Sequence, residues 1–504
     1  KSYGIHYNFI ALKLKIILEY SYWIYLNWEL ASAIIPIFYR DFAEDNLMQR
    51  FVNHLLKLIK RIKPSQTLVI GFLLVILTGT ILLSLPFATT SPGKLSLLDS
   101  LFTSTSAVCV TGLIVENTGQ VFTVFGQIVI ITLIQIGGLG FMTMASLFFI
   151  MLGKRISLRE RLVIQEAYNL DSIHGVVRLV RNAVIITFTT EAVGAVFFAI
   201  RMIPKFGLGK GIYHSVFLAI SSFCNAGFDA LGNYSSLREY VSDPIVNITV
   251  MLLITLGGIG FPVFIDFIHK RSFKRMMLHS KLVLIMSGTL FITGAILTAM
   301  FEWNNPKTIG ELNAPTKIMA SCFQSVTLRT AGFETIPQNN LTPAGSLIGI
   351  IYMFIGASPA STGGGIKTTT FFIVILSLVS MVRGKQDTNI FRRRISDQII
   401  RKATTILSIA LCLVLVDTVV ISAVENMTGG NETLGQILFE VVSAFGTVGL
   451  STGITSGLNW ISKILIIITM FAGRLGPFTL SMAISGATPK QDTLHYPEER
   501  LIIG

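Results

Sequence analysis

The sequence predicts an all-α integral membrane protein made of four same-orientation repeats, each a helix, a pore loop and a second helix, arranged around a pseudo-fourfold pore. Two observations carry this prediction. The 504-residue chain is 52% hydrophobic and only 13% charged, with a mean hydropathy of +0.68, which leaves too little polar surface for a soluble protein. In addition, a short motif containing serine and glycine occurs four times.

Each copy of this motif places a glycine directly before a leucine or phenylalanine. The four glycines are Gly112, Gly227, Gly332 and Gly449. A serine lies six residues before the glycine in three copies and seven before it in the third, where it is Ser325, and a phenylalanine lies nine or ten before it. A simple turn requires a glycine but not these neighbours. Four matched copies therefore favour four similar structural units.

Eight apolar segments are long enough to span a bilayer, two in each unit. A spanning helix needs about 20 mostly apolar residues, and the candidates are 66–87, 121–152, 179–203, 244–268, 280–301, 345–382, 401–424 and 458–486. Between the two spans of a unit lies a shorter amphipathic segment, which is 97–108 in the first unit. We expect it to enter the membrane as a half-helix and to return through the motif, which is tolerated where such backbone is buried in protein or lines a watery cavity.

The units follow one another along the chain. Residues 1–63 form an N-terminal cytoplasmic or interfacial segment, for which a helix lying in the interface is preferred to an extra span because Glu19 and Glu29 interrupt its apolar stretch. The remaining boundaries are 64–178 for repeat 1, 179–279 for repeat 2, 280–400 for repeat 3, 401–486 for repeat 4 and 487–504 for a C-terminal tail.

The net charge of +13 lies mainly in the linkers between units, such as Lys270-Arg271 and 392–394. The opposite connections contain acids such as Glu302 and Glu425. By the positive-inside rule the basic linkers are cytoplasmic, so all four units have one orientation, unlike inverted-repeat transporters. The positive charge therefore indicates topology and contact with membrane lipid, and no nucleic acid is expected as a partner.

The four glycines suit a selectivity filter for a monovalent cation. Rings of backbone carbonyls can replace the hydration shell of such an ion, glycine leaves no side chain on the axis, and the partly negative C-termini of the half-helices would point at the centre. Asp229 and Glu334 follow their glycines in only two repeats and are interpreted as mouth residues. The predicted filter consists of Thr111, Gly112, Ala226, Gly227, Ala331, Gly332, Val448 and Gly449.

The second helix of repeat 3 cannot stay regular, because a proline and three consecutive glycines interrupt it between Gly356 and Lys367. We expect this segment to form a gate below the filter, held by the buried cation of Arg474, although a static kink with a structural arginine is the alternative. The predicted gate residues are Gly356, Ser358, Ser361, Thr362, Gly363, Gly364, Gly365, Lys367 and Arg474.

Other features have simpler interpretations. The glycines at 137–140 and 257–260 suggest close helix packing. Arg329 is expected to brace the filter from behind, with Glu334 as one candidate partner. Glu191 and Asp417 are expected to pair with polar neighbours rather than to relay protons.

These features together resemble the Trk/Ktr/HKT potassium transporters, and the membrane subunits of bacterial Ktr systems in particular. The resemblance covers about 64–504 and rests on four motifs, at 134–142, 330–333, 443–450 and 496–504. It implies a multi-pass protein of the bacterial plasma membrane that takes up K⁺, with K⁺ held at Gly112, Gly227, Gly332 and Gly449. Gly112 implies selectivity for K⁺ over Na⁺.

The resemblance further implies Na⁺ as an activator, no covalent cofactor and a homodimer in which each protomer has its own pore. It also implies a cytosolic ring of nucleotide-binding regulatory subunits of the KtrA or KtrC type. A Na⁺- or H⁺-coupled potassium symporter with alternating access remains the alternative. A membrane enzyme is disfavoured because the chain lacks a His-Glu-x-x-His motif, a Ser/His/Asp constellation and paired carboxylates.

Overall fold

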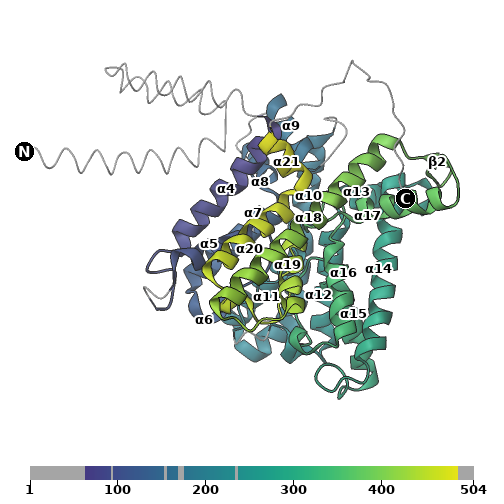
Figure 1. Cartoon of the computed structure of the whole chain (residues 1–504). Coiled ribbons are helices and arrows are strands. Elements are labelled where there is room, and N and C mark those ends of the chain that lie inside the picture. The colour runs from purple at the N-terminus through teal and green to yellow at the C-terminus, as the bar shows by residue number, and fades with distance from the viewer. Residues whose placement is uncertain (1–62, 92–94, 152–155, 169–174, 233–235, 486–504) are drawn as a thin grey trace, which may run out of the picture.

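The computed structural model describes residues 63–91, 95–151, 156–168, 175–232 and 236–485. The interfacial helix predicted before residue 63 and the C-terminal tail lie outside these ranges. The described chain folds into helices that run mostly between two ends of the molecule (Figure 1). Its only strands are the short antiparallel pair β1 (Asn389–Ile390) and β2 (Arg393–Arg394). The predicted all-α class is confirmed.

Each unit begins with a long apolar helix followed by a shorter one. The long helices are α4 (Pro64–Leu83), α10 (Val176–Phe206), α14 (Leu278–Glu302) and α18 (Asp397–Thr428). The shorter helices are α5 (Leu97–Val108), α11 (Leu208–Phe223), α15 (Ala314–Thr327) and α19 (Leu434–Gly446). Side-chain caps at Ser96, Asn313 and Thr433 begin three of these shorter helices by accepting hydrogen bonds from first-turn backbone N–H groups.

The second helices of repeats 1, 2 and 4 are sharply bent, which corrects the continuous spans 121–152, 244–268 and 458–486. They consist of α7 (Val124–Leu139) with α8 (Phe141–Met151), α12 (Pro244–Ile259) with α13 (Phe261–Lys270), and α20 (Trp460–Leu475) with α21 (Pro477–Ser485). The bends are 96°, 95° and 98°. Each occurs at a glycine with positive φ, Gly140, Gly260 or Gly476, a conformation that side chains disfavour.

The second helix of repeat 3 is broken over a longer stretch. It forms α16 (Pro343–Phe354) and α17 (Thr368–Val382), joined by an irregular segment between them. Within the described residues, four helices are long and apolar enough to cross a membrane, and seven crossings result if each bent pair counts as one. The remaining predicted span, 345–382, corresponds to α16 and α17.

The remaining elements are short connections. They are α6 (Thr118–Val121), α9 (Leu158–Ala167), and the 3₁₀ turns η1 (Arg238–Tyr240), η2 (Phe273–Arg275), η3 (Gln338–Asn340) and η4 (Thr455–Gly457). In Figure 1, α9, α13, α21 and the strand pair lie towards one end of the molecule and α6 towards the other. The basic linkers therefore share the first end, as expected for units of one orientation.

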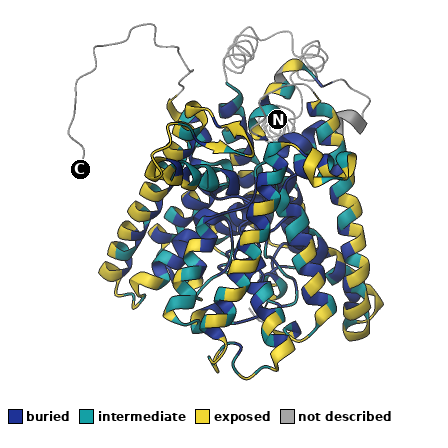
Figure 2. Ribbon diagram, turned by 90° about the vertical axis from the view of Figure 1, so that its right-hand side faces the viewer, coloured by how far each residue is buried: buried dark blue, intermediate teal, exposed yellow. Residues whose placement is uncertain are grey.

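Burial follows the distance from the centre of the molecule, as Figure 2 shows. The motif phenylalanines Phe102, Phe217, Phe323 and Phe439 are fully buried. In contrast, the long first helices expose large apolar side chains on their outer faces, including Leu77, Val196, Ile296 and Val419. An apolar outer surface around a core rich in buried polar groups is the arrangement expected of a protein surrounded by lipid.

Candidate ion-conduction site

The four glycine motifs adopt one backbone conformation. Each short helix ends one to three residues before a residue in the left-handed region: Val110, Asn225, Thr330 or Thr447, with φ between 49° and 63° in each case. Two positions later comes the motif glycine, again with positive φ: Gly112, Gly227, Gly332 or Gly449. Non-glycine residues rarely hold positive φ unless their surroundings impose it. The repeated conformation shows that the four loops are structurally equivalent.

The four glycines meet in a closed ring. A methyl group added to Gly112 would strike the carbonyl oxygen of Ala226, and the same relation links Gly227 to Ala331, Gly332 to Val448 and Gly449 to Thr111. Each glycine thus lies against the residue that precedes the glycine of the next repeat. The glycine of repeat 4 lies in the same way against repeat 1, which closes the ring. All eight predicted filter residues belong to this arrangement, which we call the glycine ring.

Hydrogen bonds from the short helices hold the glycine ring in place. Ser106 Oγ accepts from Gly112 N, and Ser443 Oγ accepts from Gly449 N, both at 3.1 Å. Ser221 Oγ instead donates to the carbonyl of Phe228 at 2.6 Å. The motif serines of repeats 1, 2 and 4 therefore fix the backbone beside their own glycine.

In repeat 3 this role belongs to Thr327, not to Ser325 as the spacing suggested. Thr327 Oγ1 donates to the carbonyl of Phe333 at 2.6 Å. Ser325 bonds to Phe291 O of α14 at 2.8 Å, as Ser104 bonds to Ile76 O of α4 at 2.7 Å. The repeat 3 motif is one residue shorter between its phenylalanine and its glycine, so matching serine to serine misaligned it.

The irregular segment of repeat 3, Gly356 to Lys367, packs against repeats 2 and 4, and we call it the 356–367 loop. Repeat 2 holds it through Ser358 N to Gly258 O at 3.1 Å and Thr362 N to Gly257 O at 3.2 Å. Repeat 4 holds it through Gly364 N to Thr447 Oγ1 at 3.0 Å and Gly365 N to Gly473 O at 3.2 Å.

The loop also has internal bonds and a close approach to the glycine ring. Ser361 Oγ donates to Ser358 O at 2.6 Å. Gly356 lies against the carbonyl of Gly364, and a side chain on Gly363 would strike Thr330, two residues before Gly332. The loop therefore lies on the side of the ring formed by the residues before the motif glycines, such as Thr330. The mouth residues, which follow the glycines, lie on the opposite side.

Two cations hold consecutive carbonyls of this loop. Lys367 Nζ donates to Gly363 O at 2.7 Å, and Arg474 Nη1 donates to Thr362 O. Arg474 Nη2 donates to Gly137 O and, at 3.1 Å, to Gly138 O of α7. Arg474 thus joins repeat 4, the loop of repeat 3 and repeat 1, and within the described residues neither cation has an acidic partner.

The glycines of the second helices allow this close assembly. A side chain on Gly137, Gly257 or Gly473 would strike the carbonyl of Val108, Phe223 or Phe445, at the ends of the three short helices. The structure thus explains the repeated glycines by contact with the short helices, as well as by the bends that follow them. Repeats 1, 2 and 4 all meet both constraints.

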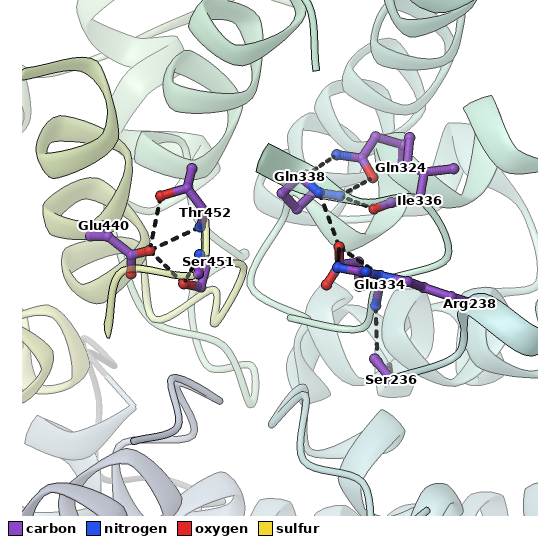
Figure 3. A network of polar contacts seen from close by, with 10 residues as sticks. Ser236, Arg238, Gln324, Glu334, Ile336, Gln338, Glu440, Ser451 and Thr452 are labelled. Atoms are coloured by element: carbon purple, nitrogen blue, oxygen red, sulfur yellow. Dashed lines mark hydrogen bonds and ion pairs between the residues drawn. The ribbon is translucent and has the colours of Figure 1, made fainter. Parts of the chain in front are cut away.

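Polar side chains line the mouth of the ring on its other side. Asp229 and Gly227 border one small cavity with Asn117, and burial raises the pKa of Asp229 to about 6, although the Leu231 backbone N–H bonds to it. Glu334 pairs with Arg238 of repeat 2, with Nη2 and Oε1 2.5 Å apart (Figure 3). Burial raises the pKa of Glu334, and Arg238 partly opposes this.

The suggested pairing of Arg329 with Glu334 is not seen among the described residues, where Glu334 pairs with Arg238. In the described part of the chain the Nε of Arg329 is buried without a hydrogen-bond partner. The other two isolated acids do have polar neighbours: Gln135 Nε2 donates to Glu191 at 3.1 Å, and Thr469 Oγ1 donates to Asp417.

Sequence reasoning missed Glu440 and the ion pair of Asp99 with Lys463. Glu440 is buried in α19 and accepts hydrogen bonds from the chain just after Gly449. Lys463 Nζ of α20 lies 3.0 Å from Asp99 Oδ1 of α5, joining repeat 4 to repeat 1. A buried acid in an apolar helix was the available signal for Glu440, whereas the ion pair joins residues far apart in the sequence.

The chain was then compared with known proteins. The family model for TrkH, described as a cation transport protein, matches residues 53–496. The chain belongs to the TrkH family of cation transport proteins. Two similar members are the Ktr system potassium uptake protein B of Bacillus subtilis, 43% identical over 89% of this chain and 99% of that protein, and the potassium/sodium uptake protein NtpJ of Enterococcus hirae, 40% identical over 88% and 98%.

The fold of the TrkH family matches as well. A crystal structure of the potassium transporter TrkH from Vibrio parahaemolyticus aligns with a TM-score of 0.62 at 18% identity, covering 90% of this chain and 94% of that one. Members of this family are transporters and not enzymes, so the membrane-enzyme alternative is excluded and the resemblance to the Trk/Ktr group is confirmed.

Proposed function

We propose that this chain is a potassium-selective uptake pore whose filter is the glycine ring. The observation that carries the proposal is the cyclic contact of four equivalent glycine loops, each glycine against a backbone carbonyl of the next repeat. A ring of backbone carbonyls without acidic side chains suits a monovalent cation rather than a divalent one. Potassium is favoured because two relatives, 43% and 40% identical, are named as a potassium uptake protein and a potassium/sodium uptake protein.

The 356–367 loop acts as the gate in this proposal, and Arg474 is its latch. The loop lies against the ring, and its carbonyls bind two cations that have no acidic partner among the described residues. Their positive field opposes passage of K⁺ while the loop is in place. Movement of the loop away from the axis would break the Arg474 contacts and remove the barrier.

The remaining features of the proposal concern regulation and placement. Na⁺ acts as an activator in this proposal, and the name of one relative, a potassium/sodium uptake protein, shows that sodium is relevant to a similar protein. The chain is a homodimer in the bacterial plasma membrane with its basic end in the cytoplasm, where a nucleotide-binding ring of the KtrA or KtrC type docks. The relatives' names as parts of a Ktr system favour such a multi-component assembly.

Cation uptake by the purified chain in proteoliposomes tests the function. With ⁸⁶Rb⁺ as tracer and protein-free liposomes as control, external K⁺ and Rb⁺ should compete strongly, Na⁺ and Li⁺ weakly, and added Na⁺ should raise the rate. If no monovalent cation enters, the proposal is wrong. If each K⁺ enters with a fixed number of Na⁺ or H⁺ at a slow saturating rate, the alternating-access symporter replaces it.

A further inference from the structure

Glu440 is a buried carboxylate beside the glycine ring that the proposed conduction step does not use. It lies in α19, nine residues before Gly449, and is 1% exposed. Its Oε1 accepts from Ser451 Oγ at 2.5 Å, Thr452 N at 2.9 Å and Thr452 Oγ1 at 3.3 Å. Its Oε2 accepts from Thr455 Oγ1 at 3.0 Å. One side chain thus ties the short helix to the segment that leaves the ring (Figure 3).

The donors around Glu440 match an ionised carboxylate. Thr452 N can only donate, and Ser451 Oγ already accepts from Gly453 N at 2.8 Å, so its own proton is available for Glu440. An ionised carboxylate accepts hydrogen bonds and donates none. The four contacts therefore form one satisfied network, and such charge-assisted bonds are among the stronger ones in proteins.

The same helix position differs among the repeats. In repeat 3, allowing for the shorter motif, it is Gln324, which exchanges hydrogen bonds with Gln338 at 2.7 and 3.2 Å. Gln338 lies six residues past Gly332, as Thr455 lies six past Gly449. Repeats 3 and 4 therefore connect the short helix to the outgoing segment at equivalent points.

In the described residues of repeats 1 and 2, this helix position makes no such connection. Thr103 occupies the position in repeat 1 and donates to Asp99 O of its own helix at 2.8 Å. Leu218 occupies it in repeat 2 and has no polar group. Within the described residues, the position of Glu440 therefore connects the short helix to the outgoing segment in repeats 3 and 4 only.

We propose that Glu440 is a positioning residue for ion selectivity: by clamping residues 451–455 onto α19, it fixes the orientation of the Val448 and Gly449 carbonyls. A carbonyl ring discriminates between ions of different size only if its oxygens are held at a set spacing or number. Loss of the clamp leaves Thr452 N without its acceptor and lets the outgoing segment move. The inference rests on the proposed function, since it assigns a cause to the selectivity of that ring.

Three variants separate positioning from a direct effect of charge. Glu440→Ala removes every contact. Glu440→Gln keeps the Oε1 contacts and can donate to Thr455 Oγ1, whose hydroxyl can then turn to Ser451 Oγ, 2.9 Å away. Thr103→Val alters the same position in repeat 1, where no clamp exists, and serves as the matched control. A combined Ser451→Ala and Thr455→Val variant removes the donors while leaving the carboxylate intact.

The readout is the ratio of K⁺ to Na⁺ concentrations that half-inhibit ⁸⁶Rb⁺ uptake in proteoliposomes. Glu440→Ala and the Ser451→Ala/Thr455→Val variant should lower K⁺ discrimination about tenfold. Glu440→Gln and Thr103→Val should keep it within about twofold of the parent. Thermal unfolding in detergent and gel filtration establish that each variant is folded.

Several outcomes would overturn the inference. Equal loss in Glu440→Gln and Glu440→Ala would mean that the carboxylate acts by its charge. Full selectivity in Glu440→Ala, or in the donor variant if Glu440→Ala fails to fold, would mean that the clamp does not set selectivity. If the parent itself does not prefer K⁺, the proposed function fails, and that result is distinct from a selective parent with insensitive variants.

Discussion

At the scale of single residues, Arg474 combines a positive charge with a planar set of donors, and lysine reproduces only the charge. Its guanidinium is always charged and presents several donors in a fixed plane, and here these donors reach Thr362 O, Gly137 O and Gly138 O. It links the 356–367 loop to α7, and in the proposed gate its charge is also the positive barrier.

Replacing Arg474 separates these two effects. Arg474→Ala should raise the maximal rate of ⁸⁶Rb⁺ uptake about tenfold, because both the barrier and the link disappear. Arg474→Lys should give an intermediate rate, since it keeps the charge and loses the forked contacts. Initial uptake rates at saturating K⁺ measure this; an Arg474→Ala rate equal to that of the parent would remove Arg474 from the gate.

Asp229 should give ion entry at the mouth a pH dependence. Its pKa of about 6 lies above the usual 3.8 because of burial, so the group is ionised above about pH 6 and neutral below it. The negative form attracts cations toward the cavity it shares with Gly227. We expect the K⁺ concentration for half-maximal uptake to rise as the external pH falls through about 6. Asp229→Asn should require the higher K⁺ concentration at every pH. If this variant keeps the pH dependence of the parent, another group causes it.

The sequence allowed most of the site residues to be selected, but not their local geometry. The glycines were found because their spacing repeats, and Arg474 because a cation in an apolar helix is costly. The left-handed conformations of Val110 and Thr447 could not be predicted, since valine and threonine disfavour them and only the surrounding packing imposes them. The role of Thr327 was hidden by a one-residue deletion.

At the scale of helices, the bends were the main feature that the sequence did not predict. The segments around Gly140 and Gly260 are apolar enough to continue as helices, and glycine alone only weakens a helix. The bend is fixed by tertiary contacts: Phe261 N, just after Gly260, donates to Ala360 O of the 356–367 loop at 3.0 Å. The spacing of apolar residues along one segment cannot predict contacts between residues so far apart in the sequence.

Two of these glycines form a matched pair for testing the contact with the gate. Gly140 and Gly260 share a positive φ, but a side chain on Gly140 meets nothing within 4 Å, whereas one on Gly260 strikes Pro359 O. Gly140→Ala should cost about 1 to 3 kcal/mol of stability from backbone strain and leave selectivity and rate near normal. Gly260→Ala should also change the uptake rate by displacing the loop.

Thermal unfolding and ⁸⁶Rb⁺ uptake of both variants measure the difference. A Gly260→Ala variant that loses stability like Gly140→Ala but transports at the parent rate would show that this side of the loop is not part of the gate.

At the scale of the whole molecule, the four repeats must close into a ring although the chain has two ends. Linkers join each repeat to the next along the chain, but repeat 4 and repeat 1 are held together only by non-covalent contacts. Lys463 and Asp99 connect these two repeats, and both side chains are largely buried. Breaking one partner of a buried pair leaves an uncompensated charge, which costs more than removing both.

Stability measurements on this seam test the closure. Lys463→Met should lower stability by about 3 kcal/mol, and the double variant Asp99→Asn/Lys463→Met should recover part of the loss. Lys317→Met is the control and should have a smaller effect, because this partly buried lysine of repeat 3 donates to Trp303 O and lies over the Trp303 ring without an acidic partner among the described residues. Equal unfolding temperatures for the parent and Lys463→Met would show that the seam does not depend on this pair.

The central claim is that the glycine ring selects the transported ion, and serine substitutions in the ring test it most directly. Gly112→Ser and Gly332→Ser each place a side chain against the next repeat. Gly429 also has a positive φ, but a side chain there meets nothing within 4 Å, so Gly429→Ser is the control for backbone strain alone. The measurement is the K⁺ over Na⁺ preference of ⁸⁶Rb⁺ uptake in proteoliposomes. The account predicts that both ring variants lose preference for K⁺ while Gly429→Ser keeps it; ring variants as selective as the parent would contradict it.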